Sequence, residues 1–185
     1  TGRAWLAGLL LLPAVRWLHR GGAPLQRWPV AHLLLWQAPA SAQAELRKRG
    51  AKVTDKIGVI DAFLERADTI LIGGAMAFPF FKAQGHEVGS SLCEEAGVEP
   101  ASRALRDAEL KGCRLLLPVD LSVGREFSAD TEQRDIDGVD TPDGWMGLDV
   151  GPKTAEAYRQ EILGAGSVFW NGPMGAFELA PFAPG

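Results

Sequence analysis

The chain contains the stretch SVFWNGPMGAFE at residues 167–178. Its first four residues are mostly β-branched or aromatic, which is typical of a buried strand. Two glycines and a proline follow at once, so the strand ends there and exposes backbone amides at its carboxyl end. In open α/β sheets, ligands bind at such strand ends. The stretch therefore predicts an α/β fold with a ligand site beside residues 171–178.

The chain upstream of this stretch, from residue 50, alternates between helical and strand patterns. Helical spacing of apolar residues predicts a helix over 57–67, capped by Thr54 or Asp55, and a buried strand follows at 69–72. Further helices are predicted near 77–85, 100–112 and 152–164, with strands at 114–119 and 167–170. The acidic stretch 124–144 is interpreted as a hairpin or loop. Such alternation predicts a parallel sheet with helices on both faces.

The composition fits one globular domain and excludes several classes of protein. The 185 residues include 46% hydrophobic and 23% charged residues and carry a net charge of −4, which gives no reason to expect a nucleic-acid partner. The two cysteines, Cys93 and Cys113, form no CxxC motif, which favours a reducing compartment and idle thiols. A disulfide between them stays a less favoured alternative.

The first 49 residues differ from the rest in charge and in pattern. They carry seven basic residues and one acid, a net charge of +6, so the other 136 residues carry −10. Four of the six tryptophans lie here, and prolines interrupt the leucine runs. We interpret residues 1–49 as a basic, tryptophan-rich leader that is not homologous to the rest, disordered or read out of frame. A secretory signal or a peripheral membrane anchor is the less favoured alternative.

Phosphate recognition would have to use glycine turns, because neither GxxxxGK[ST] nor GxGxxG is present. Lys52 and Lys56 follow Gly50 and Ala51 at a predicted helix start, which suits a polyphosphate, although such a pair is more often a solvated face. The turn at residues 73–78 allows close backbone approach or is simply a tight strand-to-helix connection. Glu178 lies just past exposed amides and either binds ribose hydroxyls or caps a helix.

Taken together, these turns resemble the phosphoglycerate kinase family. The resemblance is carried by GAKVTDKIGVI (50–60), ILIGGAMAF (70–78), KAQG (82–85), LLLPVD (115–120), PDGWMGLDVGP (142–152) and FWNGPMGAFE (169–178). It is continuous from about residue 50 to residue 185. It implies a Rossmann-like nucleotide-binding lobe, truncated relative to the family, with residues 50–185 as its partial kinase domain.

The resemblance also implies a reaction and a set of site residues. The reaction is reversible phosphoryl transfer between 1,3-bisphosphoglycerate and ADP in glycolysis, with Mg²⁺, by a cytoplasmic enzyme that we expect to be monomeric and free of membrane or nucleic-acid partners. By likeness, Lys52 approaches the phosphoryl group in flight, and Lys56 holds the nucleotide phosphates. The other expected nucleotide-binding residues are Gly50, Ala51, Gly74, Ala75, Gly147, Asn171, Gly172, Met174, Phe177 and Glu178. Positive charge and positioning are what phosphoryl transfer requires.

Departures from the family pattern shape the functional prediction. The family's glycine triplet reads Gly73-Gly74-Ala75 here, and the charged residues 45–49 replace the apolar strand that normally precedes Gly50. We expect the family's metal ligand to lie beyond the end of this chain, and its phosphoglycerate-binding lobe to be missing. Two functions stay open: a kinase fragment with negligible turnover of its own, or an inactive remnant that binds adenine nucleotide weakly.

Overall fold

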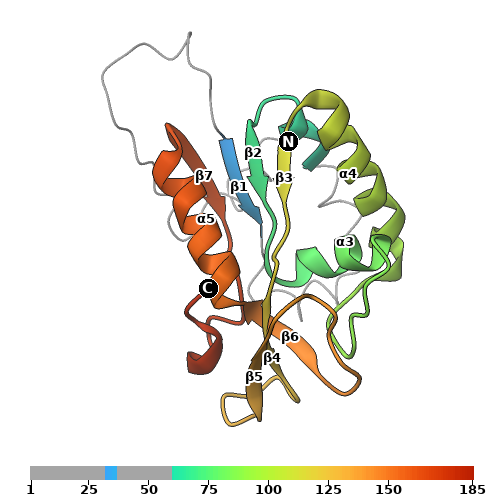
Figure 1. Cartoon of the computed structure of the whole chain (residues 1–185), viewed down its shortest axis with the longest axis vertical. Coiled ribbons are helices and arrows are strands. Elements are labelled where there is room, and N and C mark those ends of the chain that lie inside the picture. The colour runs from blue at the N-terminus through green and yellow to red at the C-terminus, as the bar shows by residue number, and fades with distance from the viewer. Residues whose placement is uncertain (1–31, 37–59) are drawn as a thin grey trace, which may run out of the picture.

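The computed structural model describes residues 32–36 and 60–185 of the chain. A layer of parallel strands forms its centre (Figure 1). Strand β1 (His32–Trp36) pairs in parallel with β7 (Ser167–Asn171), and β2 (Thr69–Leu71) pairs in parallel with β3 (Arg114–Leu116). The two pairs lie side by side with β1 next to β2, so the order across the layer is β3-β2-β1-β7.

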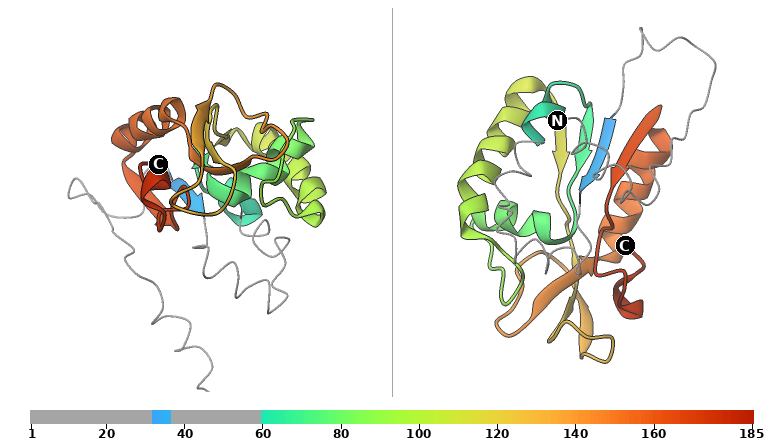
Figure 2. Two further views of the ribbon diagram at one scale, coloured as in Figure 1. Left: turned by 90° about the horizontal axis from the view of Figure 1, so that it is seen from below. Right: turned by 180° about the vertical axis from the view of Figure 1, so that it is seen from behind.

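Helices cover both faces of this layer, as the sequence pattern predicts. Alternate residues of a strand point to opposite faces, and β2 separates two cores accordingly. Ile70 packs into a cluster with the alanines of α4 (Val98–Lys111) and the phenylalanines of α3 (Ala77–Ala83), which follows the short helix η1 (Gly74–Met76). Leu71 packs into a second cluster with Tyr158 of α5 (Pro152–Gly164). Figure 2 shows α5 and α4 on different sides of the strands.

A second sheet, which is antiparallel, joins the lower end of the parallel layer in Figure 1. Its strand order is β5-β4-β6, with β4 at Leu121–Gly124, β5 at Gln133–Ile136 and β6 at Met146–Val150. The hairpin of β4 and β5 matches the prediction for the acidic stretch. Strand β6 was not predicted: its glycines indicated a turn, but residues 146–150 pair with β4 across an irregularity beside Ser122.

Local signals explain where the helices begin and end. Pro152 occupies the start of α5, where its missing N–H has no intrahelical partner to lose. Helix α4 ends at Lys111 and is capped by Gly112, whose φ of 68° is the left-handed conformation that glycine adopts without strain. Two further short helices are η2 (Glu95–Gly97) and η3 (Ala180–Phe182). Residues 60–64 are also helical and belong to the helix predicted over 57–67.

Strand β1 comes from the segment in which the sequence pattern predicts no element. Parallel strands covered on both sides read as continuous apolar runs without alternation, and residues 33–35 are three leucines in succession. Periodicity alone cannot distinguish such a short run from a collapsed leader. The other residues of the first 49, including those expected to be disordered, lie outside the described residues, and the separate origin of the leader stays a prediction.

Candidate functional site

The candidate site lies where the carboxyl ends of β2 and β7 meet β6. The segment after β7 crosses the turn after β2, and a Cβ atom placed on Gly73 would lie 2.2 Å from the Cε atom of Met174. The same segment bonds to β6, because the Ala176 amide donates to the Leu148 carbonyl at 2.7 Å. Strand β6 also contacts η1. The structure therefore brings together three of the segments that sequence analysis assigned to nucleotide binding.

The predicted residues in these segments differ in how much surface they present. Gly74, Ala75 and Gly172 are half-buried, while Phe177 is 50% exposed and Glu178 is exposed. Gly74 begins η1 with a φ of 57°, the left-handed region, which explains a glycine at the end of β2 without invoking a ligand. Among the predicted residues whose side chains the structure describes, Phe177 and Glu178 have the most surface available to a bound molecule.

Met174 and Gly147 are held by the protein itself. The Met174 side chain is 5% exposed and packs with Leu71, Val150 and Tyr158, so it faces the core. A Cβ atom on Gly147 would lie 2.6 Å from the Cζ atom of the buried Phe78 ring, and the Gly147 amide donates to Ser91 Oγ at 2.9 Å. Packing accounts for a glycine at 147, and contact of either residue with a nucleotide stays a prediction.

Five predicted site positions cannot be placed in full. Asn171 is the last residue of β7, and its side chain is not described. The predicted phosphate-binding turn lies outside the described residues; it comprises Gly50, Ala51, Lys52 and Lys56. The described structure thus contains the candidate nucleoside side of the site without the lysines that would meet the phosphates.

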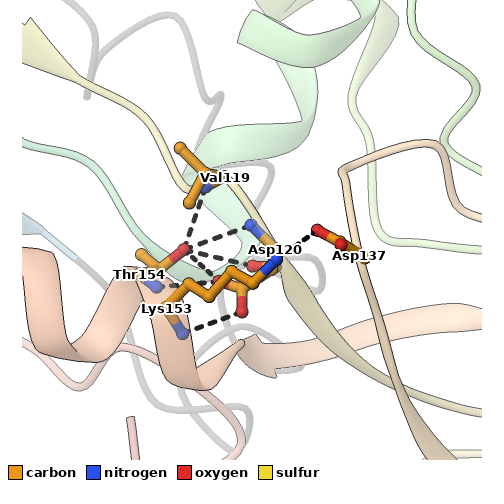
Figure 3. A network of polar contacts seen from close by, with 5 residues as sticks. All are labelled: Val119, Asp120, Asp137, Lys153 and Thr154. Carbon is orange, nitrogen blue, oxygen red and sulfur yellow. Dashed lines mark hydrogen bonds and ion pairs between the residues drawn. The ribbon is translucent and has the colours of Figure 1, made fainter.

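A buried polar network fixes the start of α5 (Figure 3). The Asp120 carboxylate, in a residue only 2% exposed, accepts the backbone amides of Lys153 and Thr154 at 2.8 Å each and the Thr154 hydroxyl. The Thr154 oxygen in turn accepts the amides of Val119 at 2.9 Å and Asp120 at 3.2 Å. A carboxylate already takes up the donors at this helix N-terminus, so these amides are not free to bind a phosphate.

Sequence reasoning quoted LLLPVD but gave Asp120 no role. The carboxylate and its partners are 33 and 34 residues apart along the chain, so no local pattern connects them. The available signals were an acid directly after a predicted strand and the helix start Pro152-Lys153-Thr154.

A second buried acid, Asp149 of β6, lies beneath the segment 172–178. Asp149 is 4% exposed, and its carboxylate accepts the amides of Val150 and Gly185 at 2.8 Å each. A Cβ atom on Gly175 would lie 2.1 Å from the Oδ1 atom of Asp149, so only glycine fits there. Burial raises the pKa of Asp149 to about 6, although the two amide hydrogen bonds act in the opposite direction. Asp149 therefore titrates near neutral pH directly against the candidate loop.

Tyr158 holds the strand ends that carry the site. Its hydroxyl lies 2.8 Å from the Ile72 carbonyl oxygen and 3.0 Å from the Leu116 carbonyl oxygen, and so links the ends of β2 and β3. Burial raises the pKa of Tyr158, which keeps the hydroxyl protonated and able to donate. Helix α5 thereby holds the end of β2, from which Gly73 and Gly74 follow, in place beside the end of β3.

The described residues contain neither a metal-ligand cluster nor a membrane-spanning helix. In residues 60–185, no three histidine, cysteine or acidic side chains come together in a way that could hold a metal ion. No helix of this part is long and apolar enough to span a bilayer. The described residues thus offer no set of ligands for the Mg²⁺ that the family resemblance implies.

Comparisons with known proteins give the same answer as the motifs. The family model described as phosphoglycerate kinase matches residues 49–185. Among curated relatives, the phosphoglycerate kinases of Chlorobium chlorochromatii and Clostridium novyi are 53% and 52% identical to the chain over 136 residues, which are 74% of this chain and 34% of each relative. The chain thus spans about a third of the length of these relatives.

Solved structures agree with the sequence relatives. The phosphoglycerate kinase of Coxiella burnetii superposes with a TM-score of 0.72 at 31% identity, covering 83% of this chain and 36% of that one. The enzyme of Pyrococcus horikoshii gives a TM-score of 0.61 at 27% identity, with coverages of 86% and 37%. These matches confirm the predicted family and the α/β fold class, and the chain belongs to the phosphoglycerate kinase family.

Proposed function

We propose that this chain forms part of the nucleotide-binding lobe of a phosphoglycerate kinase, whose reaction is reversible phosphoryl transfer between 1,3-bisphosphoglycerate and ADP. The observation that carries the proposal is the meeting of the turn after β2, strand β6 and the segment 172–178 at one edge of the sheet. Ligands of open α/β sheets bind at such carboxyl ends. Family membership supplies the substrate class, and the exposed side chains supply the candidate contacts.

In this proposal the chain positions the nucleotide and contributes charge. Gly74 and Ala75 offer a surface of small residues to the adenine, Glu178 accepts the ribose hydroxyls, and Phe177 offers an exposed ring beside them. Lys52 and Lys56 would bring positive charge to the phosphates and to the phosphoryl group in transfer. Magnesium would neutralise phosphate charge when bound with the nucleotide, and the described residues provide no ligand set for it.

The chain alone is expected to turn over negligibly. It spans about a third of the length of its relatives, and the part that would grip phosphoglycerate has no counterpart among its motifs. The second candidate function, an inactive remnant with weak nucleotide binding, follows from the same observation. The whole reaction would then require the complementary part of the enzyme, in a cell compartment that we propose to be the cytoplasm.

Calorimetric titration of the full chain with MgADP tests nucleotide binding directly. We expect measurable heat that is lost in Lys56→Ala and weakened at least tenfold in Glu178→Ala. Glu156→Ala is the matched control, because Glu156 is an exposed acid on α5 that pairs with Arg159. Absence of binding in the folded wild-type chain, or equal loss in all three variants, would refute the proposed site.

A coupled assay for ATP formation from 1,3-bisphosphoglycerate tests the expected lack of turnover. Turnover by the purified chain that disappears in Lys52→Ala would contradict the prediction of an inactive fragment. Turnover that survives Lys52→Ala would indicate a contaminating host kinase.

A further inference from the structure

Strand β1 occupies a central position in the parallel layer although it lies outside the family match. It has β2 on one side and β7 on the other, whereas the family model begins at residue 49. Its five residues pair with all five residues of β7, from His32 with Ser167 to Trp36 with Asn171. A segment without family likeness thus contributes a full strand to the core of the fold.

The structural comparison reaches further toward the N-terminus than the sequence comparison does. The Coxiella burnetii superposition covers 83% of 185 residues, which is about 154, whereas residues 49–185 number 137. The superposed part of this chain therefore begins before residue 49. Strand β1 is the described element in that region. The structural likeness to a phosphoglycerate kinase thus reaches into a part of the chain that the family model leaves out.

Strand β7 needs a partner strand in this place. Within the described residues, β1 is the strand paired with β7. Val168 and Phe169 are half-buried and Trp170 is 44% exposed, so the side chains of β7 are more exposed to solvent than those of β2, which are all buried. Without β1, the edge of β7 that it pairs with would be left open, and a gap one strand wide, about 10 Å, would separate β7 from β2. Unpaired backbone groups at such edges are costly or recruit other strands.

We infer that residues 32–36 act as an intramolecular replacement strand, which pairs with β7 and fills the place beside β2 in the parallel layer from outside the family sequence. Their apolar run supplies the backbone pairing that the charged residues 45–49 are poorly suited to give, since charge in a central strand is costly. The leader is thereby an integral component of the fold at this strand. This role of β1 is independent of nucleotide binding, and neither test below measures nucleotide binding.

Disulfide trapping in the full chain tests the pairing and its register. Leu33 and Val168 are directly paired, and adjacent strands lie about 4.8 Å apart, within the Cα separation that a disulfide spans. In a background in which Cys93 and Cys113 are alanine, Leu33→Cys/Val168→Cys is oxidised beside a control, Leu34→Cys/Val168→Cys, shifted by one residue. We expect at least tenfold more cross-link in the in-register pair. Equal cross-linking of both pairs, or none in the first, would overturn the inference.

Hydrogen exchange shows whether β7 depends on β1. Proline removes a strand's amide donor and is poorly tolerated inside a sheet, so Leu34→Pro should accelerate exchange in peptides covering residues 167–171 at least tenfold. Leu10→Pro, a change in the same leader outside β1, should alter it less than twofold. Unchanged exchange in Leu34→Pro, or equal acceleration in both variants, would contradict the inference. The cross-linking result decides the question if Leu34→Pro fails to fold.

Discussion

Replacing Asp120 by alanine should remove the acceptor on which the start of α5 depends. The carboxylate is buried and accepts two backbone amides, from Lys153 and Thr154, at 2.8 Å each, as well as the Thr154 hydroxyl. It therefore acts as the cap of α5 although it comes from the segment between β3 and β4. Helix α5 has no side-chain cap of its own at Gly151.

The expected cost follows from these three bonds. Loss of a helix cap costs about 1–2 kcal/mol, and the buried Thr154 hydroxyl, left with the backbone carbonyl of residue 120 at 3.3 Å as its acceptor, adds about 1 kcal/mol. We take about 3 kcal/mol as the loss in the free energy of unfolding. For a chain of this size, 1 kcal/mol corresponds to about 2–4 °C in Tm, so Tm should fall by about 6–12 °C.

Urea unfolding monitored by circular dichroism measures this loss, and Asp137→Ala is the matched control. Asp137 also pairs with Lys153, through Nζ at 2.7 Å, but its side chain is 82% exposed. An exposed pair of this kind contributes about 0–1 kcal/mol. A loss below about 1 kcal/mol in Asp120→Ala, or equal losses in the two variants, would refute the view that Asp120 caps α5.

Three further predictions concern the candidate site and its support. Asp149 has a folded-state pKa of about 6, above its unfolded value of about 3.9. Its stabilising contribution is therefore complete below pH 4 and decreases by roughly 3 kcal/mol as the pH rises past 6. Urea midpoints measured from pH 4 to 7 should show a flatter pH dependence in Asp149→Asn than in the unmodified chain, and equal slopes would contradict the prediction. Gly147→Ala should cost about 1–3 kcal/mol without any nucleotide, because the new methyl group meets the Phe78 ring; in calorimetric melting, Gly164→Ala, which meets open space, should change Tm little, and equal effects would disprove the packing explanation. Tyr158→Phe should cost about 1–2 kcal/mol and accelerate amide exchange in residues 69–72 more than in α4; unchanged exchange would show that the hydroxyl does not hold the strand ends.

Sequence predicted most of the elements after residue 60, because local residues mark where each of them begins or ends. Gly112 and Pro152 mark the end of α4 and the start of α5, and the β-branched and aromatic run before Gly172 marks β7. The site segments were predicted for the same reason: glycine turns after strands are local features of the chain. Elements and turns of this kind can be recognised without knowing what they pack against.

Features defined by distant contacts were missed. Strand β1 has three successive leucines but no period, and its strand character depends on β2 and β7 as neighbours. Asp120 and Asp149 read as ordinary acids in the sequence, because their partners, the start of α5 and the loop around Gly175, are brought near only by the fold. Burial converts these two carboxylates into a helix cap and a group that titrates near neutral pH.

Glycine has two explanations in a nucleotide-binding fold, and at Gly147 the packing against Phe78 supports the structural one. The missing side chain of a ligand-facing glycine makes room for the ligand. The missing side chain of Gly147 makes room for the Phe78 ring. Alanine at 147 should therefore destabilise the chain by the same amount with and without saturating MgADP, since the ring is present in both states. A ligand-facing glycine would instead lose the stabilisation that the nucleotide provides, because the added methyl group would weaken binding. Thermal melting of Gly147→Ala with and without MgADP distinguishes the two, provided that the wild-type chain shows a nucleotide-dependent rise in Tm.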